Sequence, residues 1–178
     1  MEASADSKNE ERRAVIGTAA FAVVPASVAF LVPRLLTRWT VRRPVTGGLP
    51  AQCAGAVLVG SGAAVLANSF VHFAVEGVGT PAPVAPPKHL VVGGVYRFVR
   101  NPMYVAIAAA VTGQGLLLGQ PKLFLAAALG AIPVTAFVRL YEEPTLARTF
   151  GAEYEVYRQN VPRWLPRLTP WRPDVTAP

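Results

Sequence analysis

The chain has 178 residues, of which 52% are hydrophobic and only 15% are charged. A water-soluble domain usually has about 25% charged residues. Here the apolar residues form long uncharged blocks rather than stripes, which argues against a water-soluble globular domain. The net charge of +7 fits either a nucleic acid or the anionic face of a membrane. The hydrophobicity favours the membrane, and we expect no nucleic-acid partner.

A polar leader, residues 1–13, contains four acidic residues and precedes the first uncharged block, Ala14 to Pro33. This block is longer than the core of a usual signal peptide and lacks a clear small-x-small cleavage site at its end. About 20 apolar residues in a helix cross a hydrocarbon core roughly 30 Å thick. We therefore interpret the block as a retained membrane span.

A short basic segment follows the first span. It contains Arg34, Arg38, Arg42 and Arg43, with Leu35, Leu36 and Trp39 among them. Basic residues alternating with large apolar ones are typical of a helix or turn that lies in the membrane interface. We expect an interfacial amphipathic turn here.

The second uncharged block, Cys53 to Val75, has 23 residues and predicts a second span. Ala56, Gly60 and Ala64 recur at every fourth residue, a spacing that lets two helix backbones approach closely. Asn68 and His72 are four residues apart and so share a face of this helix. Two interpretations stay open for this pair: hydrogen bonds to a neighbouring helix, or the lining of a substrate pocket.

Two shorter blocks, Met103–Gly119 and Leu123–Val138, are separated only by residues 120–122. This spacing predicts a tight hairpin of two membrane helices, and the alternation of a transmembrane β-barrel is absent. The fold class is therefore all-α, an integral membrane protein with about four transmembrane helices. Its organisation would be a leader 1–13, a transmembrane bundle 14–138, and a cytosolic C-terminal segment 139–178 with a helical tail.

The distribution of basic residues indicates the orientation. With four spans, twelve of the 17 Lys and Arg residues lie on the side that holds both termini, against five on the other side. The positive-inside rule then places both termini in the cytoplasm, in an inner or plasma membrane. On the same side, residues 80–87 contain four prolines, which predicts an extended linker.

Polar residues concentrate in two stretches on this predicted cytoplasmic side. The first runs from Gly93 into the third span and contains Asn101-Pro102, a natural start for a helix. A helix N-terminus flanked by Arg97 and Arg100 is suited to binding a carboxylate or a phosphate.

The second polar stretch begins with Glu142 and Glu143, just after the fourth span. The negative end of a helix dipole would disfavour carboxylates there. Three explanations stay open: Pro144 begins a new helix, Arg139 pairs with the glutamates, or one of the glutamates binds a cationic group of a ligand.

Both polar stretches resemble one known family. The stretch Val-Tyr-Arg-Phe-Val-Arg-Asn-Pro-Met-Tyr, Val95 to Tyr104, resembles the Arg-His/Asn-Pro-x-Tyr signature of the isoprenylcysteine carboxyl methyltransferase and phospholipid methyltransferase superfamily of integral membrane enzymes. The tail is similar to the same family's ending; it contains Glu142-Glu143, Leu146, Phe150-Gly151, Tyr154, Tyr157 and Val161-Pro162-Arg163-Trp164-Leu165-Pro166. The resemblance covers roughly residues 86–166.

The resemblance implies a methyl donor, S-adenosylmethionine (SAM), that enters from the cytosol, and a lipophilic acceptor that enters from the bilayer. It implies that Arg100, Asn101 and Pro102 cradle the methionine carboxylate and that Tyr104 lines the same wall. Glu142 or Glu143 would take the donor's ammonium group. Gly113-Gln114-Gly115 matches a family Gly-x-Gly, although helix packing explains it better. Asn101 occupies a position commonly held by His, and Asn cannot titrate.

The remaining expected site residues are aromatic or basic. Tyr96 and Tyr157 are expected at the donor, and Tyr154 and Tyr157 either close over it or pack against the membrane surface. A prenylcysteine-like carboxylate acceptor would be positioned by Arg163 or Arg139. A phospholipid amine would need Glu142 or Tyr154 to assist proton loss. The two polar stretches are expected to form a single cavity, with no metal, since His72 and His89 are far apart in sequence.

Three other functions are open on the sequence. An NADPH-dependent sterol-type reductase shares a related architecture but usually has more spans. A small multidrug-type transporter would be expected to place a carboxylate within a span, and none lies there. A non-catalytic membrane scaffold is the third alternative. The sequence identifies neither the methyl acceptor nor the oligomeric state.

Overall fold

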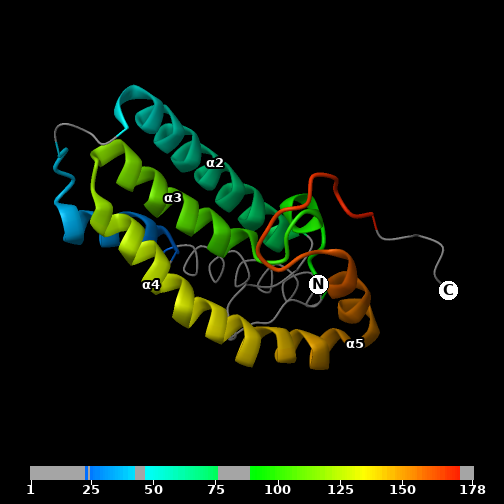
Figure 1. Cartoon of the computed structure of the whole chain (residues 1–178). Helices are drawn as coiled ribbons and strands as arrows, with labels where there is room; N and C mark the ends of the chain where they lie inside the picture. Colours follow the sequence, from blue (N-terminus) through cyan, green and yellow to red (C-terminus); the bar gives the residue numbers. More distant parts are fainter. Residues whose placement is uncertain (1–22, 24, 43–46, 76–88, 173–178) are drawn as a thin grey trace, which may run out of the picture. The chain divides into compact units, whose positions relative to one another are not determined.

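A computed structural model describes residues 23, 25–42, 47–75 and 89–172 (Figure 1). The leader 1–13, most of the first expected span and the linker 80–87 lie outside the described residues. Every regular element in the described ranges is helical. In chain order the elements are Pro25–Thr37, α2 (Gly48–Val75), the 3₁₀ helix η1 (Gly94–Arg97), α3 (Pro102–Leu118), α4 (Pro121–Phe137), the π-helical turn η2 (Val138–Glu142) and α5 (Glu143–Asn160). For these residues the all-α prediction is confirmed, with four apolar helices.

The hairpin between the third and fourth apolar helices is confirmed. α3 ends at Leu118 and α4 begins at Pro121, so only Gly119 and Gln120 connect them. Gly119 adopts φ +63, a left-handed conformation that costs glycine little. Pro121 can open α4 because the first helical residue needs no N–H donor.

By its internal contacts the chain divides into two compact units. The apolar unit consists of Val24–Ala67 and Met103–Thr145, and the polar unit of Met1–Val23, Asn68–Pro102 and Leu146–Pro178. The first holds most of the apolar helices, and the second holds most of the polar side chains that the sequence singles out.

Within the apolar unit, α2 and α3 lie side by side (Figure 1) and touch through glycines. A Cβ on Gly55 would lie 2.7 Å from the carbonyl oxygen of Gly113, and a Cβ on Gly62 would lie 2.7 Å from that of Ala106. The contacts run in opposite directions along the two helices, so the helices are antiparallel. The expected packing stripe Ala56-Gly60-Ala64 is wrong for this contact, because these residues are exposed and Gly60 has nothing within 4 Å.

This geometry predicts different effects for two glycines of the same helix. Gly55→Ala should destabilise the protein by about 1–3 kcal/mol, because the methyl group would push α2 away from the α3 backbone. Gly60→Ala should be neutral or slightly stabilising, since its Cβ meets open space and Ala is the better helix former. Thermal unfolding of the two variants in detergent tests this difference. Equal melting temperatures would contradict the α2–α3 contact.

Two helical stretches, Gly48–His72 and Pro121–Asn160, are long and apolar enough to cross a membrane. Many of their large apolar side chains are exposed; Val57 is 67% exposed, Leu129 56% and Ile132 66%. Such a surface would be unfavourable in water and suits contact with lipid. Two of the four expected spans are therefore helices long enough to cross a membrane. The helices at the other two, Pro25–Thr37 and Pro102–Leu118, are apolar but shorter.

α4 ends at Phe137, next to the expected end at Val138, but the chain stays helical beyond it, which was not expected. The helical stretch Pro121–Asn160 has 40 residues, about twice the number that a hydrocarbon core requires, and it bends at Gly151, whose backbone angles are not helical. The π-helical turn Val138–Glu142 lies directly before Pro144, which has no N–H to donate to the carbonyl four residues earlier. Glu142 and Glu143 thus lie inside a helical stretch, and no helix-end dipole acts on them.

Candidate functional site

The two family-like stretches meet in the polar unit through backbone hydrogen bonds. The Arg100 N–H donates to the Pro162 carbonyl at 2.9 Å, and the Arg167 N–H donates to the Phe98 carbonyl at 3.0 Å. The Trp171 N–H donates to the Arg97 carbonyl at 2.9 Å, and the Arg97 Nε–H donates to the Trp171 carbonyl at 2.6 Å. The chain from Arg97 to Arg100 is therefore fixed against the C-terminal segment.

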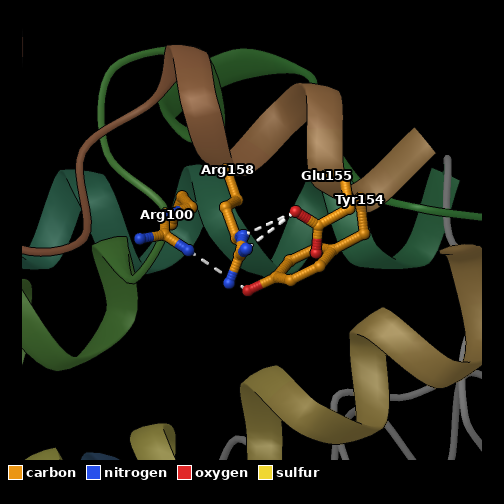
Figure 2. A network of polar contacts seen from close by, with 4 residues as sticks. All are labelled: Arg100, Tyr154, Glu155 and Arg158. Carbon is orange, nitrogen blue, oxygen red and sulfur yellow. Dashed lines mark hydrogen bonds and ion pairs between the residues drawn. The ribbon is translucent and has the colours of Figure 1, made fainter. Parts of the chain in front are cut away.

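Arg100 is held by a buried tyrosine. Its Nη1 donates to the Tyr154 hydroxyl at 3.2 Å, and Tyr154 is only 2% exposed. Figure 2 shows these two side chains pointing toward one another, with the Glu155–Arg158 ion pair beside them. A phenol is neutral near pH 7, so this hydrogen bond orients the guanidinium without cancelling its positive charge.

Tyr154 and Tyr157 belong to the core of the polar unit, together with Leu90 and Val161. The Tyr157 hydroxyl donates to the Tyr96 carbonyl at 2.8 Å. Burial raises the pKa of the Tyr157 hydroxyl, the Arg100 charge lowers it and Tyr154 raises it. Both tyrosines therefore pack inside this unit, and Tyr157 connects α5 to η1 through the Tyr96 backbone. The expected role of Tyr96 and Tyr157 at the donor stays a prediction.

A break in α5 precedes these tyrosines. Gly151 has φ +50 and ψ −122, a conformation that other residues rarely adopt, so α5 is two helices joined at a kink. The glycine of the family-like Phe150-Gly151 pair is required by the backbone at this position.

Asn101 and Arg163 are also brought together. Asn101 is 8% exposed and its Nδ2 donates to the Arg163 carbonyl at 3.2 Å. Pro102 is fully buried and begins α3, which confirms the predicted helix start. The Asn101 amide therefore fixes the backbone of Arg163, a role that an amide performs without titrating.

Asn68 and His72 share a neighbour, as expected, and it is the short 3₁₀ helix η1 rather than a membrane span. The Asn68 Oδ1 accepts a hydrogen bond from the Val95 N–H at 3.2 Å. Gly94 lies against His72 and Asn68 with φ +51, and a Cβ at Gly94 would collide with the His72 ring. The pair of glycines at 93–94 was the sequence signal for this contact, since a close approach at positive φ needs glycine.

In the apolar unit, Glu142 is paired with a tyrosine. The Tyr104 hydroxyl donates to the Glu142 Oε2 at 3.2 Å, and both residues are partly buried. Glu142 lies four residues beyond the uncharged block that ends at Val138, outside the part of the helix that a bilayer would enclose. Burial raises the pKa of the Glu142 carboxyl, the hydrogen bond from Tyr104 lowers it, and the charge of Glu143 raises it.

The other predicted site residues have different surroundings. Gly113 packs against Gly55, and a Cβ on Gly115 would lie 2.9 Å from the Phe124 ring. The Gln114 side chain between them donates to the Ala29 carbonyl at 2.8 Å. Helix packing thus accounts for the Gly-x-Gly, and its role in donor binding stays a prediction. Glu143 opens α5 directly after the π-helical turn, which the sequence analysis missed and for which no sequence signal beyond Pro144 was present.

The sequence matches the phospholipid methyltransferase family over residues 50–153. It is 36% identical over 66 residues to a phosphatidylethanolamine N-methyltransferase of Phaeosphaeria nodorum, covering 37% of this chain and 7% of that protein. It is 31% identical over 127 residues to the protein-S-isoprenylcysteine O-methyltransferase of Schizosaccharomyces pombe, covering 69% of this chain and 50% of that protein. The chain thus spans a small part of the first relative and half of the second.

These matches confirm the resemblance based on the two polar stretches. The family match covers more than half of the 178 residues and includes Arg100, Tyr104 and Glu142. The chain belongs to the phospholipid methyltransferase family.

Proposed function

We propose that this protein transfers a methyl group from SAM to a lipophilic acceptor in the membrane. Membership in the phospholipid methyltransferase family supports this proposal, and the matched relatives are named for methyl transfer to phosphatidylethanolamine or to isoprenylcysteine. The exposed apolar helices support an acceptor that arrives through lipid. The observation that carries the proposal is the fixed guanidinium of Arg100, held by Tyr154 next to the buried start of α3.

The proposed topology is the one expected from the sequence. Residues 14–138 form a transmembrane bundle of four helices, both termini face the cytoplasm, and residues 139–178 complete the donor site on that side. The helix lengths support a C-terminal segment outside the hydrocarbon, because α4 (17 residues) and η2 (5 residues) together are about long enough to cross it and α5 follows them.

The residues present fit the charged groups of SAM. In the polar unit, Arg100 supplies a cation for its carboxylate, and Asn101 and Pro102 keep the backbone around Arg100 in place. Tyr96 and Tyr157 brace the same turn through their hydrogen bond. The family resemblance also implies that Glu142 or Glu143, in the apolar unit, takes the ammonium group; within that unit Tyr104 aligns the Glu142 carboxylate. Tyr154 acts as the positioning residue for Arg100.

SAM supplies an electrophilic methyl group on a sulfonium, which is already activated for displacement. The protein therefore needs mainly to bind, align and exclude water. A carboxylate acceptor would gain an O–CH₃ bond as the S–CH₃ bond of the sulfonium breaks and the neutral thioether leaves; no proton is released, and Arg163 would orient the carboxylate. An amine acceptor must lose a proton, and the Glu142 carboxylate would accept it.

Binding of SAM and of NADPH to the detergent-purified full chain tests this proposal against the reductase and scaffold alternatives. We expect saturable binding of radiolabelled SAM that unlabelled SAM displaces and NADPH does not. Binding of NADPH instead of SAM would favour the sterol-type reductase. Binding of neither would favour the scaffold.

A further inference from the structure

A basic turn comprises the last residues of the helix Pro25–Thr37 and the residues that follow it, and it contains none of the donor residues. We define the basic turn as residues 34–42; its three arginines, Arg34, Arg38 and Arg42, are exposed. Lys122, at the start of α4, is exposed as well. The basic turn lies against the α3–α4 connection, since the Gln120 Nε2 donates to the Thr40 carbonyl at 2.8 Å and the Arg42 N–H donates to the Leu118 carbonyl at 2.9 Å. Four cations therefore gather at one end of the apolar unit.

The backbone of the basic turn is fixed. The Thr37 Oγ1 donates to the Pro33 carbonyl at 2.7 Å and accepts from the Trp39 N–H at 3.1 Å. Arg38 and Trp39 both adopt positive φ, 51 and 54, which is uncommon for residues other than glycine. The arginines are thus presented by a defined conformation rather than by a loose loop.

The apolar unit supplies no anion for these cations. Residues 14–75 and 77–141 contain no Asp or Glu. Its nearest carboxylate along α4, Glu142, is 20 residues after Lys122, which corresponds to about 30 Å of helix. In the described part of the chain, none of these four cations has an ion pair with a carboxylate. The cations are therefore available to a negatively charged group of another molecule.

The surroundings of the cations indicate the nature of that molecule. Leu35 is 70% exposed and Trp39 45% exposed, directly beside the arginines. The Arg34 guanidinium lies 5.6 Å from the centre of the Trp39 ring. Tryptophan next to arginine and leucine is typical of the membrane interface, where one side is hydrocarbon and the other carries phosphates. An anionic phospholipid offers both, whereas a nucleic acid or an acidic peptide offers no acyl chain for the leucines.

We propose that the basic turn, with Lys122, binds the headgroup of an anionic phospholipid at the membrane face opposite to Glu142. The distance of about 30 Å along the helix between Lys122 and Glu142 matches the thickness of a hydrocarbon core. This lipid site also explains why arginines lie on the side of the membrane where the positive-inside rule expects few of them. The inference does not depend on methyl transfer.

Native mass spectrometry of the full chain in neutral detergent, titrated with phosphatidylglycerol or phosphatidylcholine of the same chain length, tests the proposal. We expect phosphatidylglycerol to bind at least tenfold more tightly, with an affinity that falls as salt is added. Replacing Arg34, Arg38 and Arg42 together by Gln should weaken phosphatidylglycerol binding by about 100-fold, and replacing all three by Lys should retain most of it.

Several results would overturn this site. Equal binding of the two lipids by the wild-type chain would contradict it, and this comparison does not depend on the folding of any variant. An unchanged preference in the triple Gln variant, with an unchanged helix content by circular dichroism, would contradict it as well. If inorganic phosphate at equal concentration displaces phosphatidylglycerol, the basic turn binds a free anion and not specifically a lipid. If Arg158→Gln loses the preference for phosphatidylglycerol as fully as the triple Gln variant does, the lipid does not bind at the basic turn.

Discussion

Replacing Arg100 by Gln is expected to weaken SAM binding by about 100-fold while leaving the protein inserted in the membrane. Removing one partner of a buried charge pair costs about 2–5 kcal/mol, which corresponds to this change in affinity. Arg100 is the charged group that the polar unit fixes most firmly, through Tyr154 and through the Pro162 carbonyl. Equilibrium binding of radiolabelled SAM to detergent-purified protein measures the effect.

Figure 2 also identifies the control for this experiment. Arg158 lies beside Arg100 but is exposed and paired with Glu155 at 2.8 Å, so Arg158→Gln removes the same charge and should leave SAM binding unchanged. Tyr154→Phe keeps the Arg100 charge and removes only one hydrogen bond, so it should weaken binding by about tenfold or less. Equal loss in the Arg100 and Arg158 variants would mean that SAM responds to overall charge and not to a fixed carboxylate contact.

Glu142→Gln is expected to abolish both tight SAM binding and its pH dependence. Burial raises the pKa of Glu142 above its ordinary value of 4.5. As the pH rises through this raised pKa, the carboxylate forms and binding of the ammonium group strengthens. The stability contribution of Glu142 changes in the opposite sense: a raised pKa favours the protonated folded state at low pH, and that contribution is lost as the pH rises through the folded pKa.

Two neighbours of Glu142 should move the midpoint of this binding curve in opposite directions. Tyr104→Phe removes the hydrogen bond that lowers the pKa, so the midpoint should shift to higher pH. Glu143→Gln removes a negative charge that raises the pKa, so the midpoint should shift to lower pH. SAM titrations across a pH series measure all three variants. If Glu142→Gln, Glu143→Gln and the double variant all bind SAM as the wild type does, neither glutamate binds the ammonium group of SAM.

The helices themselves could largely be predicted from the sequence, because long uncharged blocks bounded by Gly and Pro leave few alternatives. The start of α3 at Pro102 and the hairpin at Gly119 both follow from such local signals. The packed face of α2 could not be predicted, since Gly55 and Gly62 compete with the stripe Ala56-Gly60-Ala64 on the same Gly- and Ala-rich helix. Only the position of α3 decides between the two faces.

The candidate site could be predicted as a set of residues but not as a set of contacts. The motifs singled out Arg100, Asn101, Tyr154 and Arg163, and the structure brings these four together in the polar unit. The contact of Asn101 with a backbone carbonyl 62 residues later has no local signal. The same is true of the π-helical turn before Glu143, because it depends on how the whole helical stretch accommodates Pro144.

Transfer of a radiolabelled methyl group from SAM to lipid would show whether this protein is a lipid methyltransferase. The detergent-purified full chain would be incubated with methyl-labelled SAM and a membrane lipid extract, and the organic phase counted. We expect label in the lipid fraction, strongly reduced in Arg100→Gln and retained in Arg158→Gln. Alkali then identifies the accepting atom, because a methyl ester releases volatile methanol and an N-methyl group does not. The absence of label above a no-enzyme blank, with every fraction of the extract supplied, would contradict the account.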